Sequence, residues 1–263
     1  MRKLITNIGI LAGIDSERKS RLCGKDMSHF NTLANAWLLI EDGKFNAWGE
    51  MKDMPVGGIP VDEEIDAGGG CVMPSWCDPH THIVYAGSRE GEFVDKIRGL
   101  SYAEIAKRGG GILNSADLLH TLSEDELYRE AMQRVDEIMH KGTGCVEIKS
   151  GYGLNTADEL KMLRVIRRIK ETAPLKVKST FLGAHAVGRG YSQTDYVDLV
   201  VNEMIPEVGK ERLADFVDVF CDEGFFTPDE TARILEAADK WGMKPKIHAD
   251  ELASSGGVEV GVR

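Results

Sequence analysis

The sequence of 263 residues lacks any uninterrupted apolar run near the length of about 18 residues that a membrane-spanning helix needs. Its first segment, MRKLITNIGILAGIDSE, turns from basic to apolar, but polar residues interrupt it and no small-residue cleavage site follows. Cysteine is scarce, with five residues and no Cys-x-x-Cys pair, which is unlike a disulfide-stapled secreted domain. We therefore expect a soluble, cytoplasmic protein without a membrane partner.

Basic residues are too few to balance the acidic ones. The 32 Lys and Arg stand against 43 Asp and Glu, and the net charge is −11. A surface of this sign repels a phosphate backbone, so we expect no nucleic-acid partner. A small anionic substrate would need a local cation, and Arg89 lies near the most conspicuous motif of the chain.

The chain divides into two regions that differ in their secondary-structure patterns. Residues 1–67 contain short β-like segments, and Asp42-Gly43 separates two apolar runs as a hairpin turn does. In residues 68–263, strand patterns alternate with helix patterns, as in βα units. Capping-box patterns predict helix starts at Ser123 and Thr156, and Thr227 followed by proline predicts a third.

Five of the predicted strands end in polar clusters. In a (β/α)8 barrel, such strand ends meet at one mouth, where catalytic groups gather. The fold class that we expect is therefore α/β, with a TIM barrel of about five strands, incomplete against the usual eight, and a small N-terminal β-unit. The clusters are Asp78-Pro-His80-Thr-His82, Lys149-Ser-Gly-Tyr152-Gly, Gly183-Ala-His185-Ala, Cys221-Asp-Glu223-Gly and His248-Ala-Asp-Glu251.

His80 and His82 are two residues apart at a strand end, so both imidazoles can face one point. His248, at a later strand end, offers a third nitrogen for a metal ion of the zinc type, which acidifies its bound water to a pKa of about 7. Glu251, three residues beyond His248, could shuttle that proton. A His-x-His pair also arises by chance, and a solvated loop carboxylate is the ordinary alternative for Glu251.

Three more residues are candidates for substrate binding. Arg89 suits bidentate capture of a carboxylate, although an ion pair with Glu90 or Glu92 is equally compatible with its spacing. Tyr152 lies between glycines that permit close approach to a ligand, or it packs on the next helix. His185 could donate to a polar substrate atom, yet a lone histidine at a strand end is more often structural.

Several motifs in order resemble the imidazolonepropionase family of the metal-dependent amidohydrolase superfamily: IDAGGGCVMPSWCDPHTH, DPHTHIVYAGSRE, VEIKSGYGL, TFLGAHA, DVFCDEGFF and KIHADE. The resemblance implies a (β/α)8 barrel flanked by a small β-sandwich built from both chain ends. On this basis residues 1–67 would be the N-terminal part of the composite sandwich, and residues 68–263 an incomplete barrel domain.

The same resemblance implies a site and a reaction. His80, His82 and His248 would bind one zinc or iron ion, a choice that the sequence leaves open. Glu251 would activate the metal-bound water and contact the substrate. The resemblance is also compatible with a homodimer. The implied reaction of this cyclic amide hydrolase is hydrolysis of the ring C–N bond of 4-imidazolone-5-propanoate to N-formimidoyl-L-glutamate in histidine degradation. The substrate would be held by Arg89, Tyr152 and His185.

Two other functions stay open at this point. Family members are longer and supply a further histidine and a metal-binding aspartate, which this sequence lacks. A related deaminase of nucleobases shares the His-x-His and His-x-x-Glu patterns. A non-catalytic, truncated chain that binds a metal or a partner through an open sheet edge is the third hypothesis, because unpaired edge strands favour association.

Overall fold

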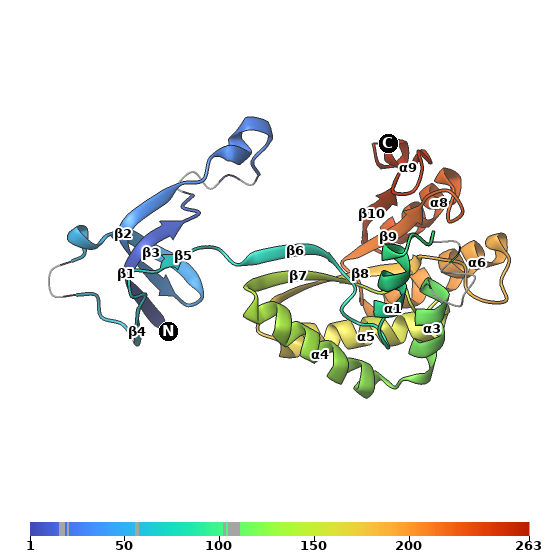
Figure 1. The fold of residues 1–263 in the computed structure, drawn as a ribbon, viewed down its shortest axis with the longest axis horizontal. Helices are drawn as coiled ribbons and strands as arrows, with labels where there is room; N and C mark the ends of the chain where they lie inside the picture. Colours follow the sequence, from blue (N-terminus) through green and yellow to red (C-terminus); the bar gives the residue numbers. More distant parts are fainter. Residues whose placement is uncertain (16–18, 20, 56–57, 102–103, 105–110, 263) are drawn as a thin grey trace. The chain divides into compact units, whose positions relative to one another are not determined.

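The computed structural model describes residues 1–15, 19, 21–55, 58–101, 104 and 111–262. The chain forms two compact units, Met1–Ser75 and Trp76–Arg263 (Figure 1). Each unit has its own sheet and its own apolar core. The candidate site residues all belong to the second unit.

The first unit is a small mixed sheet with strand order β3-β2-β1-β4, in which β1 pairs antiparallel with β2 and parallel with β4 and β5. The predicted hairpin is confirmed: Asp42 and Gly43, with φ of 49° and 75°, connect β2 to β3. Two 3-10 turns, Gly24–Ser28 and Met51–Asp53, lie between strands. The strands are β1 Arg2–Ala12, β2 Thr32–Glu41, β3 Lys44–Glu50, β4 Glu63–Asp66 and β5 Cys71–Val72.

The second unit contains a parallel sheet of five strands in the sequential order β6 to β10. The predicted βα alternation is confirmed, because a helix follows each strand. The strands are β6 Trp76–Thr81, β7 Thr143–Lys149, β8 Lys176–Ala184, β9 Phe216–Cys221 and β10 Lys244–Ala249. The helices are α1 Glu90–Ile97, α3 Ile112–Thr121, α4 Glu124–His140, α5 Thr156–Thr172, α6 Gln193–Leu199, α7 Ile205–Glu211, α8 Pro228–Asp239 and α9 Gly257–Gly261, with a π-helical turn at Val200–Met204.

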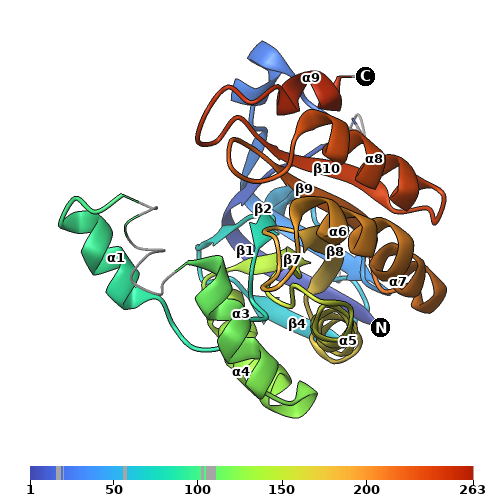
Figure 2. The same cartoon turned by 90° about the vertical axis from the view of Figure 1, so that its right-hand side faces the viewer.

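The parallel sheet is curled, and α4, α5 and α8 lie against its outer face, whereas α1 stands apart from the sheet (Figure 2). Alternate residues of each strand point to this face, and those of β7 and β9 are buried and apolar, for example Val146, Ile148 and Val219. The residues between them face the inside of the curve and include Glu147 and Lys149. The inner side therefore carries the polar groups that the strand ends present.

All three predicted helices are confirmed, but for one of them the predicted capping residue is wrong. Ser123 and Thr227 cap α4 and α8 in full capping boxes. For α5, however, the N-cap is Asn155, whose side chain accepts from the backbone N–H of Asp158. Glu159 does not turn back to Thr156, because its buried carboxylate accepts backbone N–H groups of the preceding loop instead.

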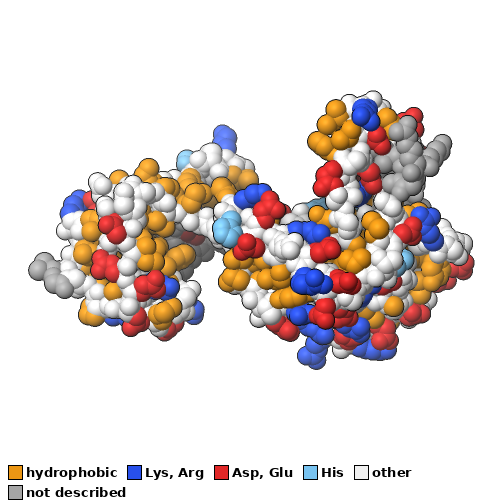
Figure 3. Space-filling view, turned by 60° about the horizontal axis from the view of Figure 1, so that its bottom comes forward, with side chains coloured by type: hydrophobic (Ala, Val, Ile, Leu, Met, Phe, Trp, Pro, Cys, Tyr) orange, Lys and Arg blue, Asp and Glu red, His pale blue; other side chains and the backbone are white. Residues whose placement is uncertain are grey.

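The surface of the second unit mixes charges of both signs. On the face that Figure 3 shows, acidic and basic side chains lie next to one another. Ion pairs between helices, such as Arg164 with Glu211 and Arg168 with Asp125, contribute to this pattern. None of the helices in the described residues has the length and apolar composition to cross a membrane. All five cysteines are described, and each is unpaired.

Candidate functional site

His80 and His248, 168 residues apart in sequence, meet at the carboxyl ends of β6 and β10. Their Nε2 atoms are 3.1 Å apart and their ring centroids 4.6 Å apart. The two strands form opposite ends of the five-stranded sheet. The curl of the sheet therefore brings together imidazoles that a flat sheet would hold far apart.

His82 lies beside this pair and faces two further candidates. Its ring centroid is 5.7 Å from that of His80, and it stacks on His185 at 5.3 Å with an interplanar angle of 10°. The Tyr152 ring lies 5.2 Å from His82 and 5.3 Å from His185. Five of the seven predicted site residues thus lie at one end of the sheet.

Burial favours the neutral form of His80, His82 and His185 by lowering their pKa values. It lowers the pKa of His82 to about 2, with the neighbouring His185 and His80 adding to the effect. Burial also lowers the pKa of His185 to about 4, although the hydrogen bond to the Gly151 carbonyl opposes the shift. The pKa of His80 is lowered by desolvation and by the nearby His248. Neutral imidazole is the form that binds a metal ion.

A buried ion-pair network lies directly beneath His248. The Oδ2 atom of Asp218 is 3.0 Å from His248 Nδ1 and 2.7 Å from Lys149 Nζ. Lys149 also donates to Glu147 at 2.5 Å, and Lys246 pairs with the other oxygen of Glu147. Burial raises the pKa of Asp218, but the His248 hydrogen bond and the charge of Lys149 outweigh it and hold the pKa at about 2.

The loop after β7 is shaped to bring Tyr152 against the histidines. Gly151 has a φ of +112°, and a Cβ there would lie 2.9 Å from His185 Nδ1. The Gly151 carbonyl accepts from that same nitrogen at 2.9 Å, so the Nε2 atom of His185 carries no proton. Glu159 accepts from the N–H groups of Gly151, Gly153 and Leu154 and fixes the loop from behind.

Glu251 lies on the loop after β10, and a buried aspartate organises that loop. Asp222 accepts from the backbone N–H of Glu251 at 2.8 Å and of Leu252 at 2.6 Å. The Glu251 side chain is exposed. Among the described residues, no hydrogen bond or ion pair joins its carboxylate to the three histidines. Glu251 is thus close to His248 in the sequence, but its carboxylate makes no hydrogen bond or ion pair with the histidines in the described structure.

Arg89 stands at the start of α1, where its guanidinium pairs with Glu92. The Nε atom donates to Glu92 Oε2 at 2.9 Å, and Glu92 Oε1 accepts from Gly111 N–H. The ion pair weighed from sequence is therefore present, with Glu92 as the partner. The positive charge of Arg89 also contributes to the lowered pKa of His185, after the larger effect of burial.

The donor set fits a metal ion of the zinc type, although no group of three or more His, Cys, Asp or Glu in the described part of the chain is arranged as a metal site as it stands. His82 Nδ1 is buried and has no hydrogen-bond partner within the described part of the chain. Zn–N bonds are about 2.0–2.1 Å long, so two nitrogens 3.1 Å apart can bind the same ion. His80, His82 and His248 are the residues that could hold it.

Sequence reasoning missed Lys149, Asp218 and Glu159 as site residues. A signal for two of them is present in the strands EIK and DFVDVFC, where charged residues alternate with apolar ones. In a strand covered by helices on one face, such alternation indicates a polar layer on the other face. Glu159 carries no such signal, because its position in a helix is typical of a capping residue.

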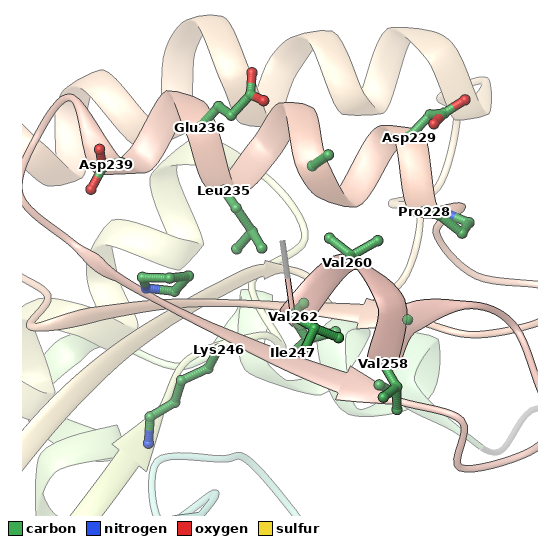
Figure 4. A pocket seen from close by; sticks show the side chains of 15 residues that line it. Pro228, Asp229, Leu235, Glu236, Asp239, Lys246, Ile247, Val258, Val260 and Val262 are labelled. Atoms are coloured by element: carbon green, nitrogen blue, oxygen red, sulfur yellow. The ribbon is translucent and has the colours of Figure 1, made fainter.

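A groove of about 980 Å³ lies away from the histidines, between α8, β10 and α9. In Figure 4, Leu235 of α8 and Val260 of α9 point toward this space, whereas the amino end of Lys246 points away from it. None of the seven candidate residues lines the groove. Its lining is mixed, with acidic residues of α8 beside valines of α9.

Solved structures share the fold at low sequence identity. A 5-methylcytosine deaminase from Klebsiella pneumoniae superposes with a TM-score of 0.63 at 17% identity, covering 99% of this chain and 54% of the deaminase. An uncharacterized metal-dependent hydrolase from Pyrococcus furiosus gives 0.57 at 13% identity, covering 100% of this chain and 69% of that one. An atrazine chlorohydrolase from Arthrobacter aurescens complexed with zinc gives 0.58 at 15%, covering 98% and 56%. These neighbours are amidohydrolase-superfamily members, and the likeness concerns the fold alone.

Sequence relatives are far closer. The chain is 52% identical to an imidazolonepropionase from Christiangramia forsetii and 48% identical to one from Flavobacterium johnsoniae, in each case over 100% of this chain. It spans 64% of the length of both relatives. No model of a protein family matches the sequence. Along its entire length the chain is thus similar to imidazolonepropionases, and it spans less than two thirds of the length of these two relatives.

Proposed function

We propose that the protein hydrolyses the ring amide C–N bond of 4-imidazolone-5-propanoate to N-formimidoyl-L-glutamate, a step in histidine degradation. The observation that carries the proposal is the meeting of His80 and His248, with Nε2 atoms 3.1 Å apart, in a chain 52% identical to an imidazolonepropionase. The chain spans only 64% of the length of that relative, so the proposed activity is that of the whole protein and not of these 263 residues alone.

One zinc or iron ion would be held by His80, His82 and His248. Imidazole nitrogens suit either ion, and a zinc-complexed hydrolase shares the fold. When bound, the ion supplies Lewis-acid polarisation of the substrate carbonyl. The orphaned ring nitrogen of His82 and the close approach of His80 to His248 support this assignment.

Glu251 would act as the general base and acid. Its carboxylate would take a proton from the attacking water and return it to the ring nitrogen that leaves as the C–N bond breaks. The Asp222 hydrogen bonds fix the backbone of its loop at the strand end, where the reacting bond would lie. Glu251 stands three residues beyond His248, which supports this role.

Arg89, Tyr152 and His185 would hold the substrate. A guanidinium has five N–H donors, so Arg89 can bind the propionate carboxylate while it keeps Glu92. His185 is neutral at pH 7, since its pKa is about 4, and its Nε2 can accept a hydrogen bond from the ring N–H of the substrate. Tyr152 lies against both His82 and His185, which supports contact with the same ligand.

The test is formation of N-formimidoyl-L-glutamate, followed by mass spectrometry, by protein loaded with Zn²⁺ or Fe²⁺. Glu251→Gln should lower kcat by about 100- to 10,000-fold, the range for loss of a general acid–base group, and should leave the metal content unchanged. Glu259→Gln, which changes a carboxylate on α9, is the matched control. No product from folded, metal-loaded protein, or ammonia release from a nucleobase in its place, would refute the proposal.

The larger architecture is also a proposal. Residues 1–67 would contribute to a composite β-sandwich, and residues 68–263 to a (β/α)8 barrel. Five parallel strands in sequential order, each followed by a helix, support the barrel. A cytoplasmic location and a homodimer stay predictions from the sequence.

A further inference from the structure

We propose that Lys149 and Asp218 are positioning residues for His248: Lys149 fixes the Asp218 carboxylate, which holds the protonated Nδ1 of His248 and leaves Nε2 bare to bind the ion. The inference deepens the proposed function, because it rests on a metal role for His248. It concerns two residues that touch neither the substrate nor the ion.

A single carboxylate oxygen of Asp218 contacts both His248 and Lys149. Asp218 Oδ2 lies 3.0 Å from His248 Nδ1 and 2.7 Å from Lys149 Nζ, and Asp218 and Lys149 are each 2% exposed at the side chain. Asp218 Oδ1 is buried and has no hydrogen-bond partner among the described residues. All of the strong contacts of this carboxylate therefore pass through Oδ2, and the position of that atom depends on Lys149.

The charges of the network are balanced in pairs. Lys149 lies between Asp218 and Glu147, and Glu147 also binds Lys246 and accepts from the Thr180 hydroxyl at 2.7 Å. Two ammonium groups thus compensate two carboxylates on the inner side of the sheet. Removal of one member of a buried ion pair leaves its partner uncompensated, which is strongly unfavourable. Lys149 is therefore needed to hold the Asp218 carboxylate in place.

The chemistry of the imidazole explains what this arrangement achieves. The ring nitrogen that can bind a metal ion is set by the hydrogen bond that the other nitrogen makes, and a carboxylate acceptor also makes the ligand more basic. Loss of such a carboxylate lowers metal affinity by about 10- to 100-fold. The Nε2 atom of His248 faces His80 Nε2, which is where the ion would bind.

The first measurement determines the tautomer of His248 in the metal-free wild-type protein. The protein labelled with ¹⁵N-histidine is studied by long-range ¹H–¹⁵N correlation at a pH where His248 is neutral, with His248→Asn used to assign the signals. We expect the proton of His248 on Nδ1. A proton on Nε2 would overturn the proposal.

The second measurement is Zn²⁺ affinity by competition with a chromophoric chelator. Asp218→Asn and Lys149→Met should each weaken binding by about 10- to 100-fold, with Asp218→Asn also moving the His248 proton off Nδ1. Lys178→Met is the control, because Lys178 lies on β8 and pairs with Asp215, outside the network. Circular dichroism identifies variants that fold.

Folded Asp218→Asn with unchanged affinity and an unchanged tautomer would refute the positioning role, whereas partial rescue by Asp218→Glu would support it. Both measurements are independent of substrate turnover. A Nδ1–H tautomer and tight Zn²⁺ binding without imidazolone hydrolysis would uphold the positioning role and refute only the proposed reaction.

Discussion

Gly151 combines an unusual backbone conformation with a tight steric position. Its φ of +112° lies in a region that other residues adopt only at a cost of about 1–3 kcal/mol. An added Cβ would also lie 2.9 Å from His185 Nδ1 and 3.0 Å from the Leu182 carbonyl oxygen. Neither atom can move without disturbing β8. The residue is therefore required for both the turn and the placement of His185.

Gly151→Ala should consequently destabilise the fold by more than backbone strain alone. The matched control is Gly190→Ala, since Gly190 also has a positive φ, of +86°, but has open space around its Cβ position. We expect a loss of about 1–3 kcal/mol in the control and a distinctly larger loss at Gly151, measured by urea unfolding. Equal losses would show that contact with His185 is unimportant.

His185 should make stability depend on pH in the mildly acidic range. The unfolded chain binds a proton at this residue below about pH 6.5, whereas the folded chain binds it only below about 4, because burial lowers the pKa. The unfolded state therefore binds more protons between these values. The free energy of unfolding should fall as pH drops from 6.5 to 4, by at most about 1.4 kcal/mol per pH unit from this group.

The variant His185→Asn removes the titration and keeps an N–H donor for the Gly151 carbonyl. Urea unfolding of the metal-free protein at pH 7 and pH 5 should show a smaller difference in the variant than in the wild type. His140→Asn, at the exposed end of α4, should retain the wild-type difference. An unaltered pH dependence in His185→Asn would contradict the assignment of the lowered pKa to burial of this ring.

At the scale of elements, helix starts show what a local pattern can and cannot predict. The Ser-x-x-Glu pattern at Ser123 predicted α4, and Thr227 followed by proline predicted α8; in both helices the glutamate three residues on turns back to the cap. The Thr-x-x-Glu pattern at Thr156 predicted α5 but not its capping residue. Asn155 is also a good cap, and the N–H groups that recruit Glu159 belong to a loop whose path is set by β7 and β8.

Glu159 couples helix α5 to the loop that carries Tyr152. Glu159→Gln should weaken this coupling, because an amide offers one acceptor oxygen in place of two to the N–H groups of Gly151, Gly153 and Leu154. We expect faster amide hydrogen exchange at Gly153 and Leu154 and a loss of about 1–3 kcal/mol in stability. Glu171→Gln, at the exposed end of the same helix, should leave exchange in the loop unchanged.

At the scale of the whole molecule, the sequence predicted which residues lie at the strand ends, but it did not predict the ion pairs on the inner face of the sheet. The strand order and the meeting of His80 with His248 follow from the parallel βα pattern. The ion pair between Lys149 and Asp218 crosses from β7 to β9, and no local spacing encodes which charged residues of different strands will pair. Arg89 was left open for the same reason, since the choice of Glu92 depends on the start of α1.

The two end strands of the parallel sheet should make the 263-residue chain self-associate. β6 and β10 each have one neighbouring strand in the described sheet, and Trp76 of β6 is 58% exposed. Unpaired edges with exposed aromatic surface favour association. Sedimentation should show mass increasing with concentration, less so in Trp76→Ser. Ile97→Ser, which changes a more exposed residue on α1, is the control, and a monomer at all concentrations would contradict this expectation.

The polar layer on the inner face of the sheet also has a consequence for how the chain folds. Strand side chains alternate between faces, so a slip of β10 by one residue against β9 would turn Lys246 and His248 toward the apolar helices. A lysine left there without Glu147 would be a buried, uncompensated charge. The residues that prepare the imidazole for an ion thus also select against misaligned strand pairing, so the site contributes to the fidelity of folding.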